Sequence, residues 1–252
     1  MNLIIIAEHD RLDGNSFRLV DFRAEHIRSV LNLNAGDPVE VGLLNGPTAT
    51  ARIERVSPGE VVLCADSWRE VPMSEPEIDL ICALPRPQTL KKVLIASAMM
   101  GVRSVHLIRA NRVEKSYFQS PLIQAENQLP YLVEGLAQGK LTRLPRVQVH
   151  DRFRQFFEDD MPHLTLDSTS TPLRLVGIQE TEYSMHDVFD RTAQEIAVAI
   201  GPEGGWVPFE IALMQSLGFR PFTLGRWTLR VEHAVIAALS QMELLRMMPS
   251  GR

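Results

Sequence analysis

The segment best suited to bind a ligand is Ile200-Gly201-Pro202-Glu203-Gly204-Gly205-Trp206, in the last quarter of the chain. An apolar run leads into its glycines, and Pro208 is a favoured residue for the first turn of the helix that follows. Glycines allow positive φ and a close approach of backbone to ligand, and the N–H groups at a helix start bind polar or anionic groups. The pattern predicts a ligand-binding loop between a strand and a helix. A tight turn without a ligand fits the same pattern equally well.

A second loop of the same form runs from Thr223 to Ala234 and includes Leu224, Gly225 and Arg230. It links a short strand, through a glycine, to a helix that is expected to begin near Glu232, where a carboxylate suits the positive end of the helix dipole. Ligands of α/β sheets lie at the carboxyl ends of the strands, so the two loops can form one pocket. Their spacing matches neither the Gly-x-Gly-x-x-Gly dinucleotide fingerprint nor a phosphate loop, which disfavours NAD and nucleoside triphosphates.

The elements that must position these loops alternate in type from residue 78 onward. We expect strands at 78–84, 104–108, 147–149, 164–166, 196–200 and 221–224, and helices at 88–100, 121–138, 208–217 and 232–247. Apolar strands that alternate with amphipathic helices predict a parallel sheet covered on both faces.

The first 70 residues have a different pattern, with strands expected at 2–7, 38–44, 49–56 and 60–65 and one helix at 24–33. Several short strands with one helix indicate a small β-barrel, a fold that often binds nucleic acid but is also used as a purely structural unit. Residues 71–77 contain Pro72 and Pro76 and few residues to bury, so we predict a linker there between domains 1–70 and 78–252.

Composition places the chain among ordinary globular proteins, with 252 residues, 45% hydrophobic residues and a formal net charge of −5. Cys64 and Cys82 lie in apolar runs, and no His/Cys cluster has metal-ligand spacing, so no metal is expected. The start of the sequence does not resemble a signal peptide, and no apolar run approaches the ~20 residues of a membrane span. We therefore expect a cytoplasmic protein with no membrane partner.

Basic residues gather in two segments despite the negative net charge. The candidates for RNA phosphate contacts are Arg86, Lys91, Lys92, Arg112, Lys115, Lys140 and Arg143. A local basic face of this kind is a reasonable footprint for a phosphate backbone. A solvated helix face accounts for the same charges, so the charge pattern alone does not decide between the two.

The two glycine loops together resemble the S-adenosylmethionine (SAM)-binding half of the SPOUT methyltransferases. Ile-Gly-Pro-Glu-Gly-Gly at 200–205, followed by Leu-Gly-x-x-x-Leu-Arg-x-Glu at 224–232, is most similar to the bacterial family that methylates N3 of a uridine in 16S ribosomal RNA. The resemblance is strong over 195–240, recognisable at 26–37 and weak between them. It implies a PUA-like, RNA-binding β-barrel followed by a knotted α/β domain that works as a homodimer and holds SAM in the knot.

Carried over by motif, the resemblance implies three cofactor loops. They comprise Leu166 and Asp167; Gly201, Glu203, Gly204 and Gly205; and Leu224, Gly225, Leu229 and Arg230. The sequence departs from the family at Ala96 and Met99, where the family usually has Lys and Glu, and at His233, where a threonine is common. These departures leave the cofactor loops intact, so the chemistry is better supported than the particular nucleotide.

Methylation of uridine N3 requires that the proton on N3 leaves, and either a base or a cation that stabilises the developing anion promotes this. The candidates are Arg230, as electrostatic stabiliser or phosphate clamp, and Glu232 or His233 as proton acceptor. A helix cap at Glu232 and a solvent-facing His233 are the alternatives without a catalytic role. We expect a SAM-dependent enzyme that methylates small-subunit ribosomal RNA; a different RNA target and a non-catalytic RNA-binding or ribosome-assembly protein remain open.

Overall fold

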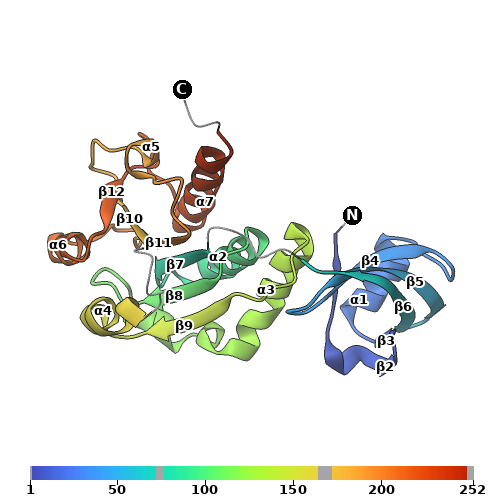
Figure 1. Cartoon of the computed structure of the whole chain (residues 1–252). Helices are drawn as coiled ribbons and strands as arrows, with labels where there is room; N and C mark the ends of the chain where they lie inside the picture. Colours follow the sequence, from blue (N-terminus) through green and yellow to red (C-terminus); the bar gives the residue numbers. More distant parts are fainter. Residues whose placement is uncertain (1, 72–76, 164–171, 249–252) are drawn as a thin grey trace. The chain divides into compact units, whose positions relative to one another are not determined.

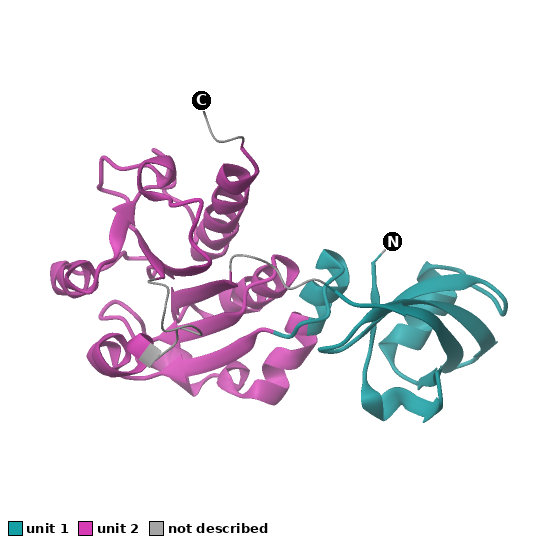
Figure 2. Cartoon of the chain, viewed as in Figure 1, with its two compact units in different colours: residues 1–73, 133–144 teal, residues 74–132, 145–252 magenta. Residues whose placement is uncertain are grey.

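The computed structural model describes residues 2–71, 77–163 and 172–248 (Figure 1). The chain divides into two compact units (Figure 2). Unit 1 comprises Met1–Met73 and Val133–Leu144, and unit 2 comprises Ser74–Leu132 and Pro145–Arg252. The chain therefore returns to the first unit once, because residues 133–144, which we placed in the second domain from the sequence, pack with the N-terminal strands.

Unit 1 is built on a curled six-stranded sheet in the order β1-β4-β5-β6-β3-β2 (Figure 1). The strands are β1 (Ile4–Ile6), β2 (Arg11–Asp13), β3 (Ser16–Leu19), β4 (Pro38–Leu43), β5 (Thr48–Ser57) and β6 (Glu60–Arg69). β1 pairs in parallel with β4, and the other neighbours are antiparallel. Alternate residues of these strands, among them Val39, Val41 and Leu63, form one buried core.

One short helical segment packs against this core. The sequence predicts a helix at 24–33, and the structure has α1 (Phe22–Glu25) followed by a π-helical turn, η2 (His26–Val30). The side chain of Asp21 caps α1 by accepting a hydrogen bond from the Arg23 N–H at 2.9 Å. The segment thereby buries Ala24 and Ile27 against the sheet.

Unit 2 is built on a second six-stranded sheet, in the order β12-β10-β11-β7-β8-β9, in which every neighbouring pair is parallel. The strands are β7 (Glu77–Ala83), β8 (Ser104–Ile108), β9 (Arg146–His150), β10 (Leu173–Gly177), β11 (Glu195–Ile200) and β12 (Arg220–Phe222). β8 and β11 are buried at every position. After Glu195, β11 appears in the sequence as a continuous apolar run, whereas β8 includes the buried polar residues Ser104 and His106.

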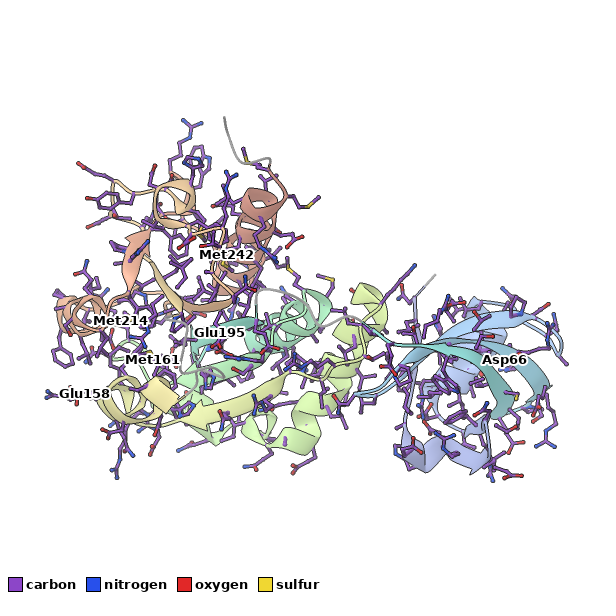
Figure 3. The ribbon with its side chains drawn as sticks, viewed as in Figure 1. Asp66, Glu158, Met161, Glu195, Met214 and Met242 are labelled. Atoms are coloured by element: carbon purple, nitrogen blue, oxygen red, sulfur yellow. The ribbon has the colours of Figure 1, made fainter. Side chains whose placement is uncertain are left out.

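Helices cover both faces of this sheet. The α-helices are α2 (Pro87–Met99), α3 (Ala125–Gly139), α4 (Phe153–Gln155), α5 (Met185–Val188), α6 (Pro208–Ser216) and α7 (Val231–Met247). Residues 133–139 of α3 belong to unit 1. Met161 and Met214 belong to the core on the α6 side, whereas Met242 is buried on α7 (Figure 3). α7 packs against α2 and β11. The remaining short helical turns are η1 (Glu8–Asp10), η3 (Lys115–Gln119), η4 (Pro121–Ile123), η5 (Phe156–Asp160) and η6 (Met161–His163).

The structure departs from the predicted elements of unit 2 in several places, among them the short helices α4 and α5, which were not predicted. β10 was not predicted, and the strand predicted at 164–166 lies outside the described residues, as does most of the predicted linker at 71–77. The helix predicted at 121–138 is divided into η4 and α3, and Pro130 lies inside α3. No helix in the described part of the chain combines the length and apolar character needed to span a bilayer.

Candidate functional site

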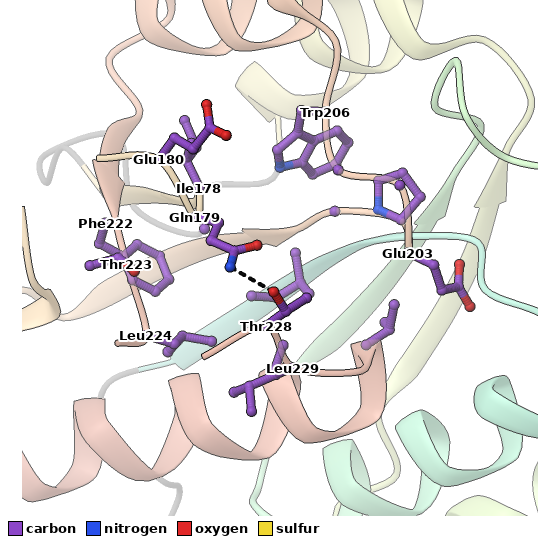
Figure 4. Close-up of a pocket in the computed structure, with 18 of the residues that line it drawn as sticks. Ile178, Gln179, Glu180, Glu203, Trp206, Phe222, Thr223, Leu224, Thr228 and Leu229 are labelled. Atoms are coloured by element: carbon purple, nitrogen blue, oxygen red, sulfur yellow. Dashed lines mark hydrogen bonds between the residues drawn. The ribbon is translucent and has the colours of Figure 1, made fainter. Parts of the chain in front are cut away.

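A pocket of about 530 Å³ lies at the carboxyl ends of three neighbouring strands, β12, β10 and β11 (Figure 4). Because these strands are parallel, the loops that leave them meet at one edge of the sheet. The residues that line it come mainly from those loops, at 177–180, 200–206, 222–225 and 227–229. This volume is within the range of small-molecule and cofactor sites.

The loop after β11 favours glycine at two positions for different reasons. Gly205 has φ of +72°, which L side chains rarely adopt, and its N–H donates to the Pro202 carbonyl at 2.8 Å. At Gly201 the constraint is space, because an added Cβ would lie 3.1 Å from Nε1 of Trp206. The loop therefore turns sharply and lies close to the indole at the inner wall of the pocket.

Trp206 contributes a polar atom without a partner to this wall. Its side chain is buried, and Nε1 has no hydrogen-bond acceptor among the described residues. A buried N–H without an acceptor costs roughly 1–3 kcal/mol, so an acceptor group on a bound ligand would offset this cost. Phe153 packs 6.0 Å from the Trp206 ring, centroid to centroid, and helps to fix the orientation of the indole.

The loops after β10 and β12 are joined to each other. Nε2 of Gln179 donates to Oγ1 of Thr228 at 2.6 Å (Figure 4), and the N–H of Ile178 donates to the Phe222 carbonyl at 2.9 Å. Gly225, with φ of +126°, forms the turn between these contacts. The pocket is thus bounded by loops that hold each other in place rather than by independent segments.

A fourth segment reaches the pocket from the carboxyl end of β8. Arg112 lines the pocket, and its guanidinium donates to the carbonyl of Gly204. The neighbouring N–H of Asn111 donates to Oε1 of Glu210 at 2.6 Å, while Oε2 of the same carboxylate accepts from the N–H of Val207 at 2.9 Å. Glu210 is buried, so this carboxylate fixes the β8 loop against the start of α6.

The loop after β12 leads directly into α7. Arg230 is the N-cap residue of this helix and is exposed, as is His233, whereas Glu232 is buried. Oε1 of Glu232 accepts from Nζ of Lys92 at 3.2 Å. Burial raises the pKa of the Glu232 carboxyl, but its own backbone N–H, Lys92 and the charge of His233 together lower it below its ordinary value. Glu232 is therefore an ionised, anchored carboxylate.

Most of the cofactor residues expected from the sequence lie together around this pocket. The ones that line it are Gly201, Glu203, Gly204, Gly205, Leu224, Gly225 and Leu229. Arg230 is adjacent to the lining, and Leu166 and Asp167 lie outside the described residues. The lining also includes Gly177, Ile178, Gln179 and Glu180, which the sequence analysis missed. The sequence feature that could have revealed these residues is the short apolar run of β10, which is interrupted by Arg174 and ends at Gly177.

The expected RNA contacts are divided between the two units. Arg86, Lys91, Lys92, Arg112 and Lys115 belong to unit 2, and Lys140 and Arg143 belong to unit 1. Several have protein partners, since Arg86 donates to Thr89 at 3.2 Å and the Lys91 ammonium lies 5.2 Å from the centre of the Tyr131 ring. Lys92 pairs with Glu232, and Arg112 contacts the glycine loop.

Cys82 lies buried in β7. Burial, with the charge of Glu203, raises the pKa of the Cys82 thiol to about 12, so this thiol is protonated and unreactive at neutral pH. Over residues 2–71, 77–163 and 172–248, no group of three or more His, Cys, Asp or Glu side chains is placed to hold a metal ion.

Comparison with known families and proteins gives one consistent result. A model of the RNA methyltransferase domain matches residues 73–243. The chain is 32% identical over 243 residues to the ribosomal RNA small subunit methyltransferase E of Treponema pallidum, covering 94% of this chain and 89% of the relative. It is 24% identical over 240 residues to the ribosomal RNA small subunit methyltransferase E 1 of Borreliella burgdorferi, covering 94% and 95% of the two chains.

Solved structures share the fold over almost the whole chain. A methyltransferase from Legionella pneumophila in complex with SAM superposes with a TM-score of 0.75 at 24% identity, over 97% of this chain and 98% of the other. A ribosomal RNA small subunit methyltransferase E from Neisseria gonorrhoeae bound to SAM gives a TM-score of 0.75 at 19% identity, over 96% and 98%. The combination of a curled sheet with a parallel α/β sheet is therefore a known architecture.

Proposed function

The chain belongs to the RNA methyltransferase family, and from that premise we propose that it transfers the methyl group of SAM to ribosomal RNA of the small subunit. The pocket at the ends of β12, β10 and β11 is the observation that carries the proposal. Similarity to the Treponema pallidum methyltransferase over 94% of this chain supports the choice of small-subunit RNA.

The residues of the pocket fit SAM in size and in chemistry. Gly201 and Trp206 line the pocket side by side, and the Nε1–H of Trp206 has no protein acceptor among the described residues, so a ligand acceptor could satisfy it. Apolar residues such as Ile200, Phe222 and Leu224 offer contacts to a purine ring. When bound, SAM supplies an electrophilic methyl group on a sulfonium centre.

We propose that residues at the start of α7 act on the target nucleotide. We propose uridine N3 as the methylated atom, with Arg230 stabilising the negative charge that develops on the base as its proton leaves. His233 is exposed on the first turn of α7 and is our candidate acceptor for that proton. Glu232 is buried and ion-paired, which makes it a weaker candidate for acceptor and a better one for anchor.

The RNA is proposed to lie along the loops that follow β7 and β8. β7 is next to β11 in the parallel sheet and β8 is next to β7, so Arg86 after β7 and Arg112 after β8 lie at the same edge as the pocket. Cations at this edge suit phosphates on either side of the target nucleotide. Lys91, Lys115, Lys140 and Arg143 are further candidates for phosphate contacts.

We also propose finer features of the fold and of the assembly, which the resemblance to the SPOUT methyltransferases implies. They are a PUA-like, RNA-binding character for the N-terminal domain (1–70), a linker at 71–77, and a knotted arrangement of the methyltransferase domain (78–252). A homodimer, with cytoplasmic action on ribosomal RNA, completes the proposed picture.

The experiment is transfer of labelled methyl groups from SAM to small ribosomal subunits that lack native uridine-N3 methylation, followed by nucleoside analysis. We expect label in 3-methyluridine. Label in another nucleoside would replace the proposed target with a different one. Absence of label in any RNA, with SAM binding retained, would favour a non-catalytic RNA-binding protein.

A further inference from the structure

An ion pair links the start of α7 to a helix that is distant in the sequence. Nζ of Lys92, on α2, lies 3.2 Å from Oε1 of Glu232, 140 positions further along the chain. The two partners differ in exposure, because the Lys92 side chain is 60% exposed and the Glu232 side chain only 3%. A solvent-facing ammonium therefore neutralises a carboxylate that is buried.

The carboxylate has few other partners. Its second oxygen, Oε2, is buried and has no hydrogen-bond donor among the described residues. Removing the cationic partner of a buried carboxylate is unfavourable, since it leaves a charge without compensation. Loss of Lys92 would therefore favour either protonation of Glu232 or a rearrangement of the helix start.

The helix start in question is part of the proposed site. Val231 and Ala234, on either side of Glu232 and His233, line the pocket. The N–H groups of His233 and Ala234 both donate to the carbonyl of Arg230, at 3.0 and 2.8 Å. These bonds make the first turn of α7 one rigid unit, so a force that holds Glu232 also holds Arg230 and His233.

We propose that Lys92 is a positioning residue for methyl transfer: its ammonium anchors the Glu232 carboxylate and thereby fixes the turn that carries Arg230 and His233. This inference rests on the function proposed above. It replaces the expectation that Lys92 contacts RNA phosphates, because the geometry gives its ammonium a protein partner in the absence of RNA.

Two variants of Lys92 distinguish the two roles. Lys92→Met removes the charge and keeps the length of the side chain, and Lys92→Arg keeps the charge. We expect Lys92→Met to lower kcat roughly tenfold with KM for the ribosomal subunit within twofold of wild type, and Lys92→Arg to restore most of kcat. A raised KM with unchanged kcat would overturn the proposal in favour of a phosphate contact, and unchanged kcat and KM would overturn it outright.

Arg154→Met, which breaks the exposed pair between Arg154 and Glu158, is the matched control and leaves kcat unchanged.

A measurement without turnover separates this inference from the proposed function. The stability lost in Lys92→Met is expected to be largest above the ordinary pKa of a Glu, 4.5, and to vanish as the pH falls below the lowered pKa of Glu232, where both proteins carry a neutral carboxyl. The loss is also expected to be absent when Lys92→Met is made in a Glu232→Gln background. A loss that is independent of pH and of Glu232 would overturn the anchoring role even if the enzyme has another substrate.

Discussion

Gln179 and Thr228 form a 2.6 Å hydrogen bond between two loops that both line the pocket (Figure 4). Gln179 follows β10 and Thr228 follows β12, so the bond ties together segments that are 49 positions apart. Both residues are exposed, and the bond is therefore close to solvent. Its position indicates that the shape of the pocket depends on side chains of the loops as well as on their backbone.

The first prediction concerns this bond. Thr228→Val removes the hydroxyl and keeps the shape, and a neutral hydrogen bond contributes about 1 kcal/mol, so we expect SAM affinity to fall about fivefold. Gln179→Ala is expected to have a similar effect, and the double variant to be no weaker than either single one. Isothermal calorimetry measures all three. Single effects that add fully in the double variant would show that the two residues act separately.

A second prediction concerns Arg230, the exposed N-cap residue of α7. Because it adjoins the pocket without lining it, Arg230→Ala is expected to retain SAM affinity within about threefold while methyl transfer in a single turnover falls roughly 100-fold, the cost of losing one transition-state stabiliser. Arg226→Ala, which removes an equal charge from the same loop at a residue stacked 4.7 Å from the Trp227 ring, serves as control. Normal transfer by Arg230→Ala would exclude a catalytic role for this residue.

The third prediction concerns a buried chain of polar groups in the sheet. Nε2 of His106 lies 2.8 Å from the hydroxyl of Ser104, and its Nδ1 lies 3.1 Å from Nε2 of His150. Burial, assisted by the charges of His150, Arg103 and Arg146 and opposed by Asp79, lowers the pKa of His106 to about 4. His106 is therefore neutral in the folded protein at any pH near neutrality.

The sign of the resulting pH dependence follows from proton binding. Between pH 6.5 and about 4 the unfolded chain holds a proton on His106 that the folded chain does not, so the free energy of unfolding decreases as the pH falls through this range. The contribution is on the order of 3 kcal/mol, present in full above pH 6.5. In His106→Gln, which has no titrating group, this part of the slope is expected to be absent. Equal slopes for the two proteins, measured by urea unfolding at several pH values, would contradict the assignment.

The sequence predicted the elements of unit 2 well where an apolar run had clear boundaries. β8 was predicted to the residue, and α6 and α7 to within one residue at each end, since Pro208 and Glu232 mark the two starts. β10 was missed because its run is short and is interrupted by Arg174, whose guanidinium donates to the Leu217 carbonyl.

Part of the site could also be predicted from the sequence. Glycine motifs are local, so Gly201, Gly204, Gly205 and Gly225 were recognisable from sequence alone. The pairing of Lys92 with Glu232 was not, because it depends on how α2 packs against α7, which is a property of the tertiary fold. Lys92 was accordingly assigned to RNA binding from its charge.

The measurement that tests the central claim most directly is SAM binding by wild type and Gly205→Val. Residue 205 has φ of +72°, so a valine there strains the loop of the pocket. Gly218→Val is the matched control, because Gly218 has φ of +85° with open space around it and does not line the pocket. We expect one SAM per wild-type chain, binding weakened at least tenfold in Gly205→Val, and near wild-type binding in Gly218→Val at a similar loss of stability. Wild-type affinity in Gly205→Val, or equal losses of affinity in both variants, would contradict the claim that this pocket holds the cofactor.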